Sequence, residues 1–215
     1  NHAGGYGSFV VGGMYNSVVS GPFAIIVGGV SNYIETSPFS RSYSGILAGY
    51  GNRIIGSSSD KSVIGGGMYN VIEYCSSSII GSGYSNYIYG ADYSAIAGGN
   101  ECVLQGSYGF IGAGSHNTNL GRLASIVAGS CNWIGAGATH GFIGAGAYNR
   151  IAGADHCMAG GFHATATNDG CFVWADSSTS AEFGSITNHE FAVRATGGVR
   201  LAENAGSSKP ILVGQ

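Results

Sequence analysis

The chain has 215 residues, of which 40 are glycine and only three are proline. This composition, with 44% hydrophobic and 9% charged residues, argues against collagen and disordered linkers and favours an ordered chain. A net charge of −3 with eight Lys and Arg residues leaves no basic surface for nucleic acid, and glycine interrupts the apolar runs, so we predict no membrane insertion. The chain starts at Asn1 rather than at a methionine, so we expect a piece of a longer protein.

One short pattern recurs along the chain, and Ser62 to Ile72 (SVIGGGMYNVI) shows it clearly. Each copy has an aliphatic residue, a pair of small residues, an asparagine and a second aliphatic residue. The asparagines recur about every 17 residues. In chain order they are Asn16, Asn32, Asn52, Asn70, Asn86, Asn100, Asn117, Asn132 and Asn149. A tenth, degenerate copy has His163 in this place.

Aliphatic residues flank each asparagine at fixed distances. Those on the N-terminal side are Val10, Ile26, Ile46, Ile64, Ile80, Ile96, Ile111, Ile126 and Ile143, with Ile96 unusually close to Asn100. Those on the C-terminal side are Val18, Ile34, Ile54, Ile72, Ile88, Ile134 and Ile151, whereas Val103 and Leu120 come one place late, as in a bulge. Two short strands joined by a glycine-rich bend explain this spacing. A repeat this short predicts an all-β protein, a parallel β-solenoid of about ten coils with ~14–20 residues each.

Stacked coils would place equivalent asparagines above one another at about 4.8 Å. Their amides could then bond along the stack, so we predict a structural asparagine ladder rather than nine solvated turns. Five cysteines without a CxxC pair (Cys75, Cys102, Cys131, Cys157 and Cys171) indicate small buried residues, and we predict no metal site and no cofactor.

A second apolar set stands one place before the inward aliphatic residues, where strand alternation points it outward. It comprises Phe9, Ile25, Val63, Ile79, Phe110 and Phe142. A monomer would leave this long apolar face exposed, which soluble monomers avoid. We therefore predict several identical coils packed about an axis, as a homotrimer.

The repeat resembles the head repeats of YadA-like trimeric adhesins and, more closely, the longer-period versions in bacterial and phage tail-fibre proteins. Ser78 to Ile88 (SIIGSGYSNYI) carries the same unit, and Gly170 to Asp176 (GCFVWAD) with Glu190 to Val199 (EFAVRATGGV) is similar to the segment that closes such arrays. The resemblance implies a homotrimer of left-handed β-rolls, extracellular, on a cell surface or a phage-like virion fibre. It also implies binding to a cell-surface polysaccharide or to an envelope or matrix protein.

The repeats occupy residues 1–167, and the changed pattern from residue 168 to residue 215 predicts a C-terminal cap that helps to fix the trimer. Two copies are longer than the others, with extra residues in Glu35 to Arg41 and in Gly56 to Lys61. Insertions in solenoids form loops on one side, which is often the binding side.

The candidate ligand site combines the first insertion with an outward row of residues that directly follow the asparagines. That row is Ser17, Tyr33, Arg53, Val71, Tyr87, Glu101, Thr118, Trp133 and Arg150. Aromatic rings stack on sugars and anchor interfaces, so we expect Tyr33, Phe39 and Arg41 to contact the ligand, with Tyr87 and Trp133 as a second patch. The alternative is structural: Phe39 plugs a neighbouring chain and Pro38 shapes the turn.

Three functions are compatible with this sequence. The irregular insertions favour a non-enzymatic receptor-binding module over a purely structural fibre segment. A glycan-degrading tailspike needs two facing carboxylates, and the acidic residues are scattered along the repeats. Asp155, His156 and His163 could form a metal or proton-relay cluster, although a degenerate last coil explains them more simply.

Overall fold

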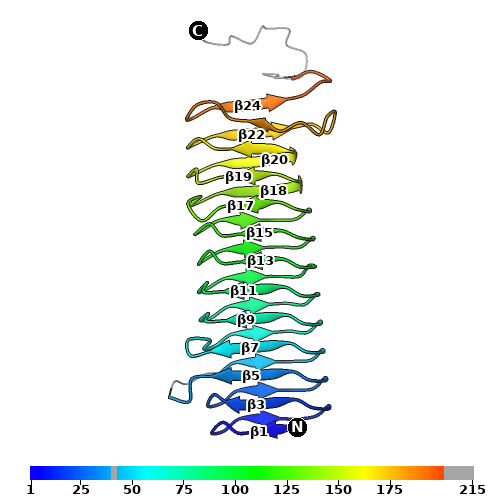
Figure 1. Cartoon of the computed structure of the whole chain (residues 1–215), viewed down its shortest axis with the longest axis vertical. Helices are drawn as coiled ribbons and strands as arrows, with labels where there is room; N and C mark the ends of the chain where they lie inside the picture. The colour runs from blue at the N-terminus through cyan, green and yellow to red at the C-terminus, as the bar shows by residue number, and fades with distance from the viewer. Residues whose placement is uncertain (40–42, 201–215) are drawn as a thin grey trace.

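The computed structural model describes residues 1–39 and 43–200 as a tall stack of parallel coils (Figure 1). Within those residues it contains 24 short strands and no helix. The strands form two 12-stranded sheets in which every pairing is parallel, and consecutive strands alternate between the sheets. The predicted all-β parallel solenoid is confirmed, with about 12 turns in place of about ten. Eleven steps of about 4.8 Å make the stack roughly 50 Å long.

We call the two sheets the odd sheet and the even sheet after their strand numbers. The odd sheet contains β1 (His2–Ala3), β3 (Ser17–Ser20), β5 (Tyr33–Thr36), β7 (Arg53–Gly56), β9 (Val71–Glu73), β11 (Tyr87–Tyr89), β13 (Val103–Leu104), β15 (Thr118–Asn119), β17 (Trp133–Ile134), β19 (Arg150–Ile151), β21 (Ala164–Ala166) and β23 (Phe183–Gly184). The even sheet contains β2 (Phe9–Val10), β4 (Ile25–Ile26), β6 (Gly45–Ile46), β8 (Val63–Ile64), β10 (Ile79–Ile80), β12 (Ala95–Ile96), β14 (Phe110–Ile111), β16 (Ser125–Ile126), β18 (Phe142–Ala147), β20 (Met158–Phe162), β22 (Phe172–Ala175) and β24 (Phe191–Arg194).

The core is a thin layer of aliphatic side chains between the two sheets. Each coil contributes one residue from each sheet, as Ile72 and Ile80 do, and both are fully buried. Equivalent residues of successive coils are paired in register, for example Ile64 with Ile80 and Ile80 with Ile96. This arrangement buries a β-branched side chain at most inward positions, which suits the pleated surface of a sheet.

Asparagines line one corner of the coil, between an even strand and the following odd strand. At Asn70 the backbone N–H donates to Asn52 Oδ1 at 3.0 Å, and Nδ2 donates to Gly66 O and Gly83 O at 3.0 Å each. Asn70 Oδ1 in turn accepts the Asn86 N–H at 3.0 Å. The backbone N–H and the side-chain amide of Asn70 therefore all have partners, which the burial of this residue requires. Buried asparagines occupy this corner in eight coils, namely Asn16, Asn32, Asn52, Asn70, Asn86, Asn117, Asn132 and Asn149.

The expectation for Asn100 does not hold. Asn100 lies two residues earlier, in a bridge with Tyr84, and Cys102 occupies the asparagine place. The Cys102 N–H donates to Asn86 Oδ1 at 3.1 Å. This coil is therefore not shortened, because Cys102 follows Ile96 at the regular spacing. The same shift turns Val103 outward and makes Leu104 the inward residue, so the bulge expected there is absent from this described coil.

Two further positions differ from the expectation. Asn119, rather than Leu120, is the inward residue of β15, fully buried and paired with Ile134. Its Nδ2 donates to Ala124 O at 2.8 Å and its Oδ1 accepts the Gly121 N–H, so the buried amide is satisfied by a local turn. In the last copy Ala164 occupies the asparagine place, because its N–H donates to Asn149 Oδ1 at 3.0 Å.

The sequence analysis did not predict two structural features, a row of buried serines and an additional asparagine. At the opposite corner Ser44, Ser62, Ser78 and Ser94 are buried and bond along the stack, each Oγ accepting the N–H of the next coil. Asn1 extends the asparagine row, since its Oδ1 accepts the Asn16 N–H at 3.1 Å. The serines, and Asn1 relative to Asn16, recur in the sequence at about the spacing of one coil, and this spacing could have predicted both features.

The segment expected to form a cap continues the same two sheets through β22, β23 and β24. Arg194 fastens this end: its guanidinium donates to Ala181 O at 2.7 Å and to Asp176 O at 3.1 Å, and lies 3.5 Å from the Asp176 carboxylate. Residues 201–215, also assigned to the cap, lie outside the described residues. The described part of the chain contains no helix that is long and apolar enough to cross a membrane.

Candidate functional site

The outer surfaces of the two sheets differ in chemistry. Among the described even strands, only β24 contains an ionisable residue, Arg194. Exposed apolar side chains instead follow the even sheet from end to end, and we call this surface the even face. They are Phe9, Val11, Val27, Leu47, Ile79, Phe110, Val127, Phe142, Met158, Trp174 and Phe191. Isolated exposed apolar residues are ordinary, but a continuous face of them marks an interaction surface.

The outer surface of the odd sheet, which we call the odd face, carries charged and aromatic residues. Its central row is Ser17, Tyr33, Arg53, Val71, Tyr87, Val103, Thr118, Trp133, Arg150 and Thr165, each paired in register with the next. Val103 takes the place in which Glu101 was expected. Glu101 lies at the asparagine corner instead, where its carboxylate is 2.9 Å from His116 Nε2.

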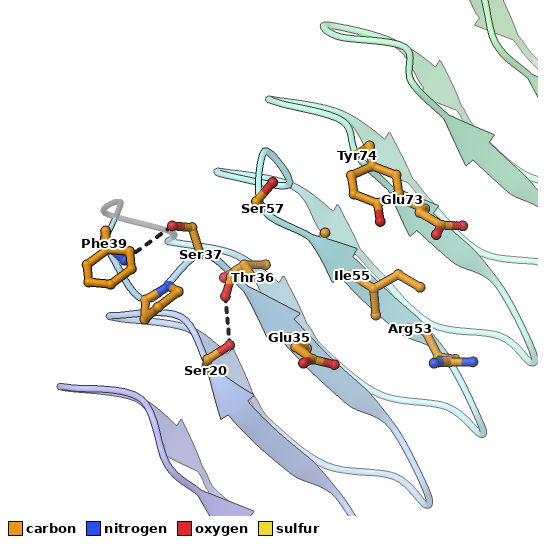
Figure 2. A pocket seen from close by; sticks show the side chains of 12 residues that line it. Ser20, Glu35, Thr36, Ser37, Phe39, Arg53, Ile55, Ser57, Glu73 and Tyr74 are labelled. Carbon is orange, nitrogen blue, oxygen red and sulfur yellow. Dashed lines mark hydrogen bonds between the residues drawn. The ribbon is translucent and has the colours of Figure 1, made fainter.

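A groove of about 520 Å³ crosses the odd face next to the first insertion, and we call it the insertion groove (Figure 2). β5, β7 and β9 form its floor, and the turns after β5 and β7 form its rim. The longer second copy brings Gly56 and Ser57 to the same rim. Residues that line the groove include Glu35, Phe39, Arg53, Ile55, Glu73 and Tyr74.

Two carboxylates in this groove are each bound by a tyrosine. Tyr33 OH donates to Glu35 Oε2, and Tyr87 OH donates to Glu73 Oε2 at 2.6 Å. The hydrogen bond to Glu35 raises the pKa of the Tyr33 phenol. Burial, followed by the hydrogen bond to Glu73, raises the pKa of the Tyr87 phenol. Both tyrosines are protonated at neutral pH, so each donates its hydroxyl proton to its carboxylate.

Among the described residues that line the groove, Arg53 supplies the positive charge. Its guanidinium lies over the Tyr33 ring at 5.4 Å from the ring centroid, in a cation–π contact. Glu35 and Glu73 stand in the neighbouring outward row on either side of Ile55, one coil away in each direction. The groove thus offers hydrogen-bond donors, two acceptors and an apolar floor within three coils.

The residues predicted to bind ligand are only partly brought together. Phe39 lines the insertion groove and is 97% exposed, so it packs on nothing among the described residues. Arg41 lies outside the described residues. Tyr33 supports the groove through Glu35 and Arg53. Tyr87 and Trp133 share one outward row but are three coils apart, about 14 Å, and do not form a common patch.

Sequence reasoning did not single out Glu35, Glu73 or Tyr74 as groove residues. Glu35 and Glu73 each stand three residues after the asparagine of their own coil, so the repeat places them in the same outward row. That alignment was the available signal. It becomes visible only when the two long intervals are recognised as insertions that leave the strands in register.

The histidines do not gather into a reactive cluster. His156 stacks on His140 at 4.6 Å, whereas His163 stacks on Tyr148 at 4.9 Å at the other corner of the coil. In the described part of the chain, no group of three His, Cys, Asp or Glu residues is placed to hold a metal ion. Four of the five cysteines are buried, and none of the five is disulfide-bonded.

The insertion groove is therefore an open site with polar and aromatic walls. A scan of protein-family models found no matching family for this chain, and a search of curated proteins found no matching relative.

Proposed function

We propose that this chain is the non-enzymatic receptor-binding module of an extracellular homotrimeric fibre, either a surface adhesin or a phage-like tail fibre. In this arrangement three left-handed coils pack their even faces around a common axis, and residues 168–215 close the stack. The odd faces, with their insertion grooves, point outward to a cell-surface polysaccharide or an envelope or matrix protein.

The contrast between the two faces is the observation that carries this proposal. The even face is apolar along its whole length, and burying it between copies would remove the cost of hydrating it. It also has an apolar hollow of about 300 Å³ between Phe142, Met158, Phe172 and Trp174, which can receive a bulky side chain of a neighbouring copy. Threefold packing would repeat each insertion groove three times, so weak sites could act together through avidity.

Light scattering and cell binding test the two halves of the proposal separately. We expect a species of about three times 21.7 kDa, and a stable monomer of 21.7 kDa would refute the trimer. We expect fluorescently labelled protein to bind cells that display the receptor, and Tyr74→Ala to weaken that binding without changing the mass. Unchanged cell binding by Tyr74→Ala would contradict the proposal that the insertion groove binds the receptor.

Glycan hydrolysis is the second candidate, because Glu35 and Glu73 line one groove (Figure 2). Their backbone positions are two coils apart, about 9.6 Å, and inverting glycosidases hold their carboxyl groups about 6.5–9.5 Å apart. Incubation with a bound polysaccharide, followed by a reducing-end assay, separates the two functions. We expect no sugar release. Release that is lost in Glu73→Gln would favour the tailspike instead, and a glycan array without any hit would favour a purely structural segment.

A further inference from the structure

We propose that the odd face carries a second glycan subsite around Trp133 and Arg150, and that both this subsite and the insertion groove take uncharged sugar polymers. This inference rests on the proposed function, namely that the odd face binds a surface glycan. It adds a location and the chemical class of the ligand.

The second subsite is a pocket of about 280 Å³ on the odd face, which we call the Trp133 pocket. Its lining includes Trp133, Tyr148, Arg150, His163, Thr165 and Glu182. The Arg150 guanidinium lies over the Trp133 ring at 4.9 Å from the centroid. The Tyr148 and His163 rings stack at 4.9 Å and form another wall. The pocket therefore has an indole platform with a cation fixed above it.

The same device occurs in the insertion groove. In both places an arginine stacks over the aromatic residue that precedes it by one coil in the central outward row, as Arg53 does over Tyr33. The two arginines lie six coils apart on the same face, at about 29 Å. One extended polymer running along the stack can reach both subsites, whereas a short oligosaccharide occupies one at a time.

The charges of the two subsites select the class of sugar. Two ion pairs are formed among the described residues, His116 with Glu101 and Arg194 with Asp176. Arg53 and Arg150 belong to neither, so their N–H groups are available to a ligand. Each subsite also presents carboxylate: Glu35 and Glu73 in the groove, Glu182 in the pocket.

Sugar hydroxyl groups both donate and accept hydrogen bonds, so they match sites that combine a guanidinium with a carboxylate over an aromatic ring. An acidic polymer would meet the carboxylates and a chain with a net charge of −3. An amino-sugar polymer would meet the arginines. Uncharged polymers avoid both penalties.

The experiment measures binding of the whole protein to a panel of soluble polysaccharides: a neutral glucan, mannan and galactan, the uronic acid polymer alginate, and the amino-sugar polymer chitosan. Arg53→Ala and Arg150→Ala are each compared with wild type on the neutral polymer that binds best. Arg122→Ala is the matched control, because Arg122 stacks over Tyr108 at 5.7 Å and lines neither subsite. Trp133 fluorescence in a Trp174→Phe background reports occupancy of the Trp133 pocket, since these are the two tryptophans of the chain.

We expect at least one neutral polymer to bind, each single variant to lose about tenfold in affinity, and Arg122→Ala to bind as wild type does. We also expect the polymer to change Trp133 emission. Arg150→Ala binding as tightly as wild type, or an unchanged Trp133 emission, would refute the second subsite while leaving the proposed function intact. Tighter binding of alginate or chitosan, or no binding by any neutral polymer, would overturn the ligand class. Cell binding that survives in that case would show that the proposed function itself stands.

Discussion

The two faces of the solenoid share one backbone pattern but differ in side chains. On the even face the outward residues are aliphatic, aromatic or small from β2 to β22. On the odd face the equivalent positions carry Glu35, Arg53, Glu73 and Arg150. The two sheets share one core and are joined by the same two corners. Folding alone therefore does not require their outer surfaces to differ. Under the proposed function, this difference assigns the even face to a hydrophobic partner surface and the odd face to water and a polar ligand.

A charge placed on each face in turn should have the largest effect. Phe110→Glu puts three carboxylates into the proposed trimer contact, where burial of unpaired charge costs several kcal/mol per group. Thr118→Glu, on the odd face of the same coil, is the matched control. We expect Phe110→Glu to abolish the trimer in light scattering and Thr118→Glu to leave it intact. Trimers in both variants would mean that the even face is not the contact.

Both faces depend on a common core and corner that hold the coils in register. Asn70→Ala removes the acceptor of the Asn86 N–H and the donors to Gly66 O and Gly83 O, so we expect it to destabilise each chain by about 1–3 kcal/mol. Asn100→Ala is the control, because Asn100 lies outside the asparagine row. Chemical denaturation of both variants measures the difference. Equal stability of the two variants would contradict the structural role of the row.

A gain of stability is expected where the asparagine row is interrupted. Cys102 Sγ reaches Gly114 O only at 3.7 Å, whereas the asparagine amides of other coils donate to the corresponding glycine at about 3 Å. Cys102→Asn should therefore stabilise the chain by about 0.5–1.5 kcal/mol, without altering either face. Cys102→Ala, which adds no hydrogen bond, should not stabilise it. A lower melting temperature for Cys102→Asn would show that the local backbone is fitted to the thiol.

The smallest expected effect is a change in stability at alkaline pH, which arises from Tyr87 on the odd face and not from the even face. Burial and the Glu73 hydrogen bond raise the pKa of Tyr87 above its usual value of about 10 in the unfolded chain. The stability that Tyr87 contributes is therefore complete below pH ~10 and decreases as pH rises through the higher folded pKa. Tyr87→Phe should flatten this alkaline slope slightly. The described strands of the even face contain no group that titrates between pH 6 and 9, so the mass of the proposed trimer should stay constant over that range.

The sequence predicted the repeat, the inward aliphatic rows and most of the asparagine row because these depend on spacing within one coil. Asn100 was wrongly assigned to the asparagine row because its residue type was given more weight than its distance in sequence from Ile96. Ile96 and Leu104 mark Cys102 as the corner residue, and they bracket it at the regular spacing. Asn119 was missed for a similar reason, because only apolar residues were considered for core positions. Its side-chain amide can be buried because a local turn supplies its hydrogen-bond partners.

The insertion groove could not be predicted to the same extent. Glu35, Ile55 and Glu73 become neighbours only through pairing between coils, and two insertions of different length separate them in the chain. Sequence alone does not fix whether such residues extend the strand or leave it. In the structure Glu35 and Thr36 remain in β5, and the loop begins after them. The site therefore depends on register, which the local pattern does not specify.

The in-register parallel stacking has a consequence for how such a chain can change by tandem duplication. Adding or deleting one whole coil shifts all later coils by about 4.8 Å along the axis but leaves each side chain on its original face. The distance between the two arginine–aromatic pairs along the axis can therefore change only in multiples of one coil, about 4.8 Å. If the proposed glycan subsites bind one polymer, a gain or loss of whole coils between Arg53 and Arg150 would fit them to a polymer of different repeat length without any change in their side chains.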